Sequence, residues 1–76
     1  MTFKTVEIEL DDEIIREAEA LARKLQMTFD TYVNVALLES LSRQDTTKVL
    51  QDHLAAHSEI TKPLELEEAW RILGRA

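Results

Sequence analysis

The two histidines, His53 and His57, have the residue type and the spacing that could hold a metal ion. Residues four apart lie on one face of a helix, where two imidazoles can bind the same zinc ion. Such a site needs further ligands, and this sequence has no cysteine and no third ligand placed beside the pair. We therefore expect both histidines to lie on a solvated helix surface, with no metal and no cofactor bound.

Serine and carboxylate side chains are the other groups that could do chemistry. Ser40, Ser42 and Ser58 have no histidine and carboxylate arranged to activate a hydroxyl as a nucleophile. The carboxylates are scattered along a chain of only 76 residues, which leaves little room for an enclosing pocket. The sequence therefore predicts that the protein is not an enzyme and has no catalytic residue.

The composition narrows the class of protein further. Fifteen acidic residues outnumber nine Lys and Arg residues, and the net charge of -6 repels phosphate backbones at long range. The chain has no cysteine for a disulfide framework, no apolar run long enough to span a membrane and no signal peptide, so we expect a cytoplasmic protein. A single domain of this size buries only a modest fraction of its surface, and association with another chain is a usual remedy.

Helical patterns occupy most of the sequence. Residues 12–25 carry apolar side chains at helical spacing behind the acidic caps Asp11 and Asp12, which predicts an amphipathic helix. Residues 28–43 predict a second helix with Thr28 as its N-cap. Because apolar side chains surround this second helix, we expect it to be buried on two sides.

The C-terminal half predicts two further helices. A polar run at 42–45 is the expected hinge, and residues 47–57 follow it with a thin apolar stripe. Pro63 then interrupts the helical pattern, and an amphipathic helix follows at 66–73 until Gly74 stops it.

Residues 5–10 are the only convincing strand in the sequence. Alternation places Val6, Ile8 and Leu10 on an apolar face and Thr5, Glu7 and Glu9 on the opposite face. No second strand pattern exists to pair with this one, so we expect it to pair with the same strand of a second copy. The predicted homodimer interface combines the strand with the second helix and contains Val6, Ile8, Leu10, Val33, Leu37 and Leu41.

This order of elements resembles the ribbon-helix-helix family of methionine-repressor and Arc-like proteins over residues 3–43. The alternating residues 5–10, the acidic entry at 11–14 and the connection at 25–31 carry the resemblance. Gln26 stands where the family commonly has glycine, so we expect it to adopt a left-handed conformation. The resemblance implies a mainly α fold with a ribbon-helix-helix dimerisation domain at 1–43 and a helical C-terminal extension at 44–76.

The resemblance also implies a DNA-binding face. In the family, the paired strands enter the major groove and the start of the second helix contacts phosphate. By position, the base-reading residues would be Thr5, Glu7 and Glu9, and the phosphate-binding residues would be Thr28 and Phe29. The glutamates would weaken DNA binding by repulsion, although a glutamate can accept a hydrogen bond from cytosine. A transcriptional regulator is therefore the alternative function.

The leading function that the resemblance implies is an antitoxin of a type II toxin-antitoxin pair. Its C-terminal tail would bind and neutralise a cognate toxin, a ribonuclease, through Leu66, Trp70, Arg71, Leu73 and Arg75. A PIN-type toxin would receive an arginine at its metal-binding carboxylates, whereas a RelE-like toxin would attract the glutamates of the tail. The apolar stripe of the tail has a second interpretation, in which it folds back onto the helices of its own chain or onto the dimer mate.

Overall fold

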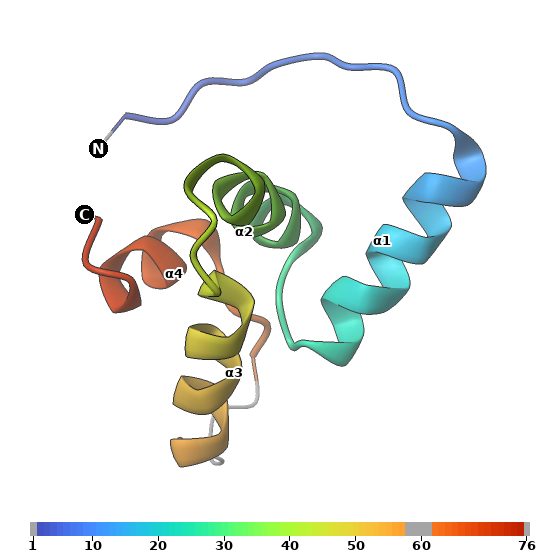
Figure 1. Cartoon of the computed structure of the whole chain (residues 1–76). Coiled ribbons are helices and arrows are strands. Elements are labelled where there is room, and N and C mark those ends of the chain that lie inside the picture. The colour runs from blue at the N-terminus through green and yellow to red at the C-terminus, as the bar shows by residue number, and fades with distance from the viewer. Residues whose placement is uncertain (1, 58–61, 76) are drawn as a thin grey trace.

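The computed structural model describes residues 2–57 and 62–75. Within these residues the chain has four helices: α1 (Asp12–Lys24), α2 (Phe29–Ser42), α3 (Thr46–Ala56) and α4 (Leu66–Ile72) (Figure 1). The central helix, α2, packs against each of the other three, and α3 also packs against α4. Helix α1 packs on α2 alone, so it stands at the edge of the fold.

The N-terminal segment is not a strand, and the prediction of a ribbon-helix-helix fold is wrong. Residues 2–11 run as an extended trace from α1 past α2, and every one of them is exposed (Figure 1). A strand needs ladder hydrogen bonds to a neighbour, and residues 2–10 form no backbone hydrogen bond with any other described residue. We call residues 2–11 the N-terminal arm. Its alternation assigns side chains to two faces, but alternation by itself supplies no pairing partner.

The four helices lie close to their predicted positions because their end signals are strong. Asp11 caps α1 by accepting a hydrogen bond of 2.8 Å from the Glu13 N–H. At the other end Gln26 has φ 58°, which confirms its predicted left-handed conformation. The N–H of Gln26 donates to the carbonyl of Arg23 at 3.1 Å, and the N–H of Met27 donates to that of Ala22 at 2.8 Å. These two bonds form a Schellman motif, which ends α1.

Helix α2 begins at its predicted cap and ends in a second left-handed residue. The Thr28 hydroxyl accepts a bond of 3.2 Å from the Thr31 N–H and lies 2.7 Å from the Thr31 hydroxyl. At the C-terminal end Arg43 has φ 58°, and its N–H donates to the Glu39 carbonyl at 2.8 Å. The turn into α3 is capped by Asp45, whose carboxylate accepts a hydrogen bond of 3.3 Å from the Lys48 N–H.

A single hydrophobic core draws on the middle of the chain and on its C-terminal segment. The buried members of this core are Met27, Val35, Leu50, Leu64, Ala69 and Trp70. The segment before α4 reaches the α1–α2 connection as a short parallel bridge between Leu64 and Met27. Residues 64–73 are therefore part of the fold and pack against α2 and α3.

Candidate functional site

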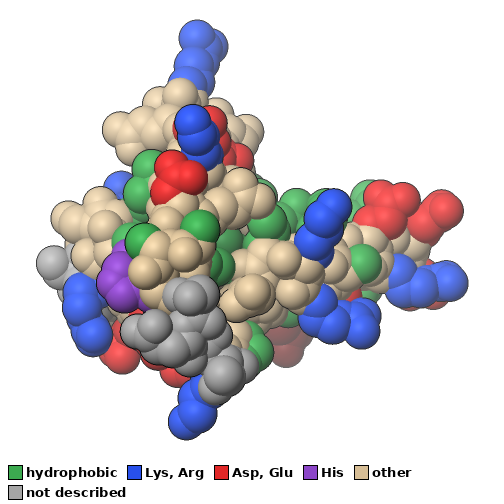
Figure 2. Space-filling view, turned by 90° about the horizontal axis from the view of Figure 1, so that it is seen from below, with side chains coloured by type: hydrophobic (Ala, Val, Ile, Leu, Met, Phe, Trp, Pro, Cys, Tyr) green, Lys and Arg blue, Asp and Glu red, His purple; other side chains and the backbone are tan. Residues whose placement is uncertain are grey.

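Large apolar side chains remain exposed on the N-terminal arm, α1 and α2. We call seven of them the exposed apolar set: Val6, Ile8, Leu10, Ile14, Leu21, Leu37 and Leu41. Leu41 is 83% exposed and Val6 is 72% exposed, far above what an apolar side chain has in a core. In Figure 2, α1 projects from the body of the molecule, with green hydrophobic side chains among its charged ones. Leu37 and Leu41 lie one helical turn apart on α2, and exposed apolar patches mark protein interfaces.

The total surface area supports the same interpretation. A compact monomer of 8.8 kDa is expected to expose about 4,800 Å², whereas this chain exposes 6050 Å². The excess of about 1,250 Å² is larger than the ~800 Å² that each partner contributes to a typical stable interface. A protein partner of ordinary size could therefore cover the exposed apolar set.

Helices α1 and α2, which carry part of the exposed apolar set, each leave large apolar side chains exposed to solvent. Helix α1 is strongly amphipathic, yet Ala22 is its only buried residue. Helix α2 buries Thr31 and Val35 on one side and leaves Leu37 and Leu41 exposed. The sequence predicted that α2 is buried on two sides. In the structure the side with Val35 is buried, and the side with Leu37 and Leu41 is exposed.

The residues of the predicted dimer interface are available to a partner. Val6, Ile8 and Leu10 are exposed on the arm, Leu37 and Leu41 are exposed on α2, and Val33 is half-buried. Their pairing with a second copy stays a prediction.

The predicted DNA-facing residues lie on two segments, the arm and the start of α2. Thr5, Glu7 and Glu9 are exposed on the arm, whereas Thr28 and Phe29 are partly buried at the start of α2. The Thr28 N–H, one of the predicted phosphate donors, instead donates to the Leu64 carbonyl at 3.0 Å. No pattern in the sequence indicated this contact, because it joins segments that are far apart along the chain.

The predicted toxin-binding tail is divided between the core and the surface. Trp70 is only 6% exposed and packs in the core, with Leu66 and Leu73 half-buried beside it. Arg71 and Arg75 are exposed, and the Arg75 guanidinium lies 5.6 Å from the centre of the Trp70 ring. The structure places Trp70 in the core of its own chain, as the fold-back interpretation expects. The reason is that a small chain needs its largest apolar side chain in its own core.

The candidate chemical groups lie apart from any enclosing cavity. The rings of His53 and His57 stack at 4.2 Å, with His57 Nδ1 2.9 Å from the His53 carbonyl, and no described residue joins them in a metal-binding group of three. The Ser42 hydroxyl donates to the Leu38 carbonyl at 2.6 Å, and Ser58 lies outside the described residues.

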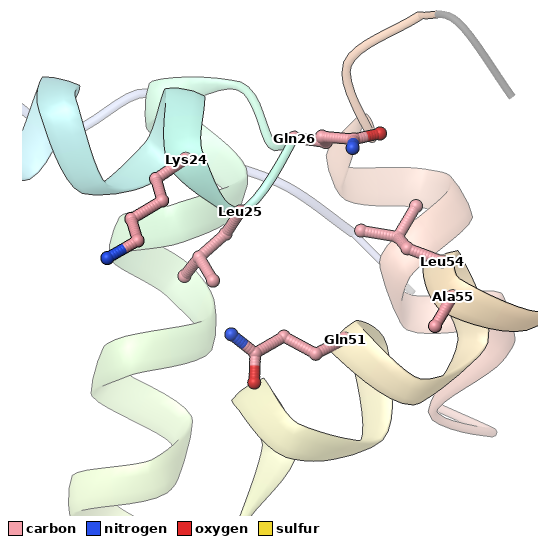
Figure 3. A pocket seen from close by; sticks show the side chains of 6 residues that line it. All are labelled: Lys24, Leu25, Gln26, Gln51, Leu54 and Ala55. Atoms are coloured by element: carbon pink, nitrogen blue, oxygen red, sulfur yellow. The ribbon is translucent and has the colours of Figure 1, made fainter. Parts of the chain in front are cut away.

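The best-defined hollow is a groove open to solvent, with a volume of about 370 Å³, between the end of α1 and α3 (Figure 3). Its lining consists of Lys24, Leu25, Gln26, Gln51, Leu54 and Ala55, with Leu25 and Leu54 on facing elements. This mixture brings no acid, base and nucleophile together.

No helix of the described part combines the length and the apolarity required to cross a bilayer. We compared the chain with protein-family models, with curated proteins and with solved structures. None of the three comparisons finds a match.

Proposed function

We propose that the protein is a cytoplasmic antitoxin that self-associates into a homodimer and neutralises a toxin protein, a ribonuclease. The observation that carries the proposal is the exposed apolar set, which leaves more surface uncovered than a compact monomer of this mass needs. Exposed large apolar side chains such as Leu37 and Leu41 are suited to contact with another protein.

The helical members of the exposed apolar set are proposed as the self-association surface. Leu37 and Leu41 lie one helical turn apart on α2, and Ile14 and Leu21 lie two turns apart on α1. In a two-fold dimer the same surface of each copy would meet, so these leucines and isoleucines would pack against their counterparts.

The charge of the chain supports a basic target. An enzyme that cleaves RNA needs a basic surface to bind phosphates, and an acidic protein is attracted to such a surface. The net charge of this chain is -6, and the exposed acidic residues Glu67 and Glu68 lie on α4 beside Arg71. We propose α4 as the toxin contact, through its exposed charged residues and without Trp70.

The DNA-binding alternative is not carried further. It depended on a ribbon of paired strands and on free donors at the start of α2. The arm is not a strand, and the Thr28 N–H is already engaged by Leu64.

The proposal is tested by co-expressing the chain with the protein encoded by the small gene that lies next to its own gene. We expect the wild-type chain to restore growth that the gene product blocks, and to elute with it as one complex. The double variant Glu67→Lys with Glu68→Lys, which reverses the acidic charge of α4, should lose rescue, whereas Val49→Lys, at an exposed position on α3, should retain it. A gene product that does not impair growth, or growth that the wild-type chain fails to restore, would overturn the antitoxin role.

A further inference from the structure

The backbone of Leu64 holds the connection between α1 and α2 from both sides. Its N–H donates to the Gln26 carbonyl at 2.6 Å, and its carbonyl accepts from the Thr28 N–H at 3.0 Å. The Leu64 side chain is 2% exposed and lies in the same core as that of Met27. One residue of the C-terminal segment thus contacts three consecutive residues of the connection, Gln26, Met27 and Thr28.

This connection sets the angle between α1 and α2. Gln26 ends α1 in a left-handed conformation, and Thr28 caps α2. Among the described helices α1 packs on α2 alone, so its direction depends on that packing and on the connection between the two helices. The exposed apolar set is divided between these two helices and the arm, so its shape depends on the same angle.

The C-terminal segment is itself a unit that docks as a whole. Leu64, Ala69 and Trp70 are all buried in the core, and α4 is a helix of 7 residues with no side-chain cap at its start. A helix this short is not stable alone in water, so α4 exists as a helix only while it is docked. Docked and undocked states therefore form a two-state element.

We infer that the Leu64–α4 segment is a clamp that couples the toxin contact to self-association. A partner that binds the docked α4 through its exposed charged residues also holds Leu64 against the connection, which fixes α1 and strengthens the pairing of two copies. Linkage requires the reverse effect as well, so self-association tightens the docking of α4. The coupling to self-association rests on the proposed function, whereas the control of the α1–α2 angle does not.

The angle is tested with two spin labels on the full chain. The sequence has no cysteine, so Arg16→Cys on α1 and Ser40→Cys on α2 provide two unique labels at exposed positions. The labelled chain is diluted into an excess of unlabelled chain, so that only the distance within one chain is measured. We expect one narrow distance distribution, which broadens when Leu64→Pro removes the N–H donor to Gln26.

Two control variants separate the clamp from general weakening of the core. Leu64→Val keeps the N–H and most of the side chain, and Leu50→Ala removes more of a side chain that is 0% exposed on α3. Both should keep the narrow distribution. Equal broadening in Leu50→Ala, or none in Leu64→Pro, would overturn the clamp.

The coupling is measured by sedimentation of the same variants. We expect Leu64→Pro to weaken self-association about fivefold or more relative to Leu50→Ala, a typical size for coupling between two sites. Equal dissociation constants for the Leu64→Pro and Leu50→Ala variants would overturn the coupling. A wild-type chain that stays monomeric at every concentration would overturn both self-association and the coupling, while the label distances would still decide the clamp.

Hydrogen exchange on the wild-type chain serves if Leu64→Pro does not fold. Self-association should slow exchange of the Leu64 and Thr28 amides, while the His57 amide at the end of α3 serves as a control. Exchange at Leu64 and Thr28 that does not change with concentration in a chain that self-associates would contradict the clamp.

Discussion

The hydroxyl of Thr46 donates a hydrogen bond of 3.2 Å to the carbonyl oxygen of Val35, inside the core. Thr46 is 3% exposed and Val35 is 1% exposed, so the bond joins the start of α3 to the middle of α2 away from water. A neighbouring bond of 2.7 Å runs from the Thr47 N–H to Glu39 Oε1. Together the two bonds fix the corner between α2 and α3.

We expect Thr46→Val to destabilise the protein by about 1 kcal/mol, because it removes a buried hydrogen bond while nearly preserving shape. Thr47→Val is the matched control, since it keeps the backbone N–H that donates to Glu39. Urea denaturation of both variants measures the free energies of unfolding. Equal stabilities for the two variants would show that the Thr46 hydroxyl contributes nothing.

The left-handed conformation of Gln26 is a site where the sequence is not optimal for stability. A residue with a side chain has a steric cost of about 1 kcal/mol at φ 58°, and glycine does not. Gln26→Gly should therefore raise the free energy of unfolding by up to about 1 kcal/mol. Gln51→Gly, on an exposed part of α3, should lower it by about 1 kcal/mol in the same denaturation experiment.

Gly74 provides the opposite substitution at the end of α4. Its φ is 76°, and a Cβ built there would meet no atom within 4 Å, so alanine would be strained without clashing. We expect Gly74→Ala to destabilise the protein by about 1 kcal/mol, measured by thermal unfolding. No loss of stability would mean that the last turn of α4 rearranges freely.

The helices could be predicted from the sequence because their signals are local. Thr28 caps α2, and Gln26 adopts the left-handed conformation expected of a residue in the place of glycine. The strand at 5–10 was a wrong prediction for a related reason: alternation is also local, whereas strand pairing depends on a neighbour. The described residues contain no such neighbour for the arm.

The interior role of the C-terminal segment could not be predicted in the same way. An amphipathic stripe that contains Trp70 is equally suited to a partner and to the core of its own chain. The choice depends on Leu64 and Met27, which lie far apart in the sequence and meet only in the fold. The exposed side of α2 was easier to predict from the sequence. Apolar side chains surround this helix, and the described residues leave one of its sides uncovered.

Trp70 tests whether the tail belongs to the core. Trp70→Ala should destabilise the protein by about 3–5 kcal/mol, because it removes a large buried side chain. Arg71→Ala, at an exposed position on the same helix, should change stability by less than about 0.5 kcal/mol. Circular dichroism during urea denaturation measures both variants, and Trp70→Phe provides a milder change if the alanine variant does not fold. Equal stabilities for the Trp70 and Arg71 variants would return Trp70 to the role of a free anchor.

The exposed half of α2 tests self-association directly. Leu37→Lys and Leu41→Lys place a charge where two copies would bury leucines, so each should shift the chain toward monomer by about tenfold or more in the dissociation constant. Neither leucine is in the core, so helicity and unfolding of the monomer should stay nearly unchanged. Val49→Lys is the matched control, since Val49 is 48% exposed on α3, outside the exposed apolar set. Sedimentation velocity over a range of concentrations measures the three variants. A wild-type chain that is always monomeric, or a Val49 variant that dissociates as readily as the Leu41 variant, would remove α2 as the self-association surface.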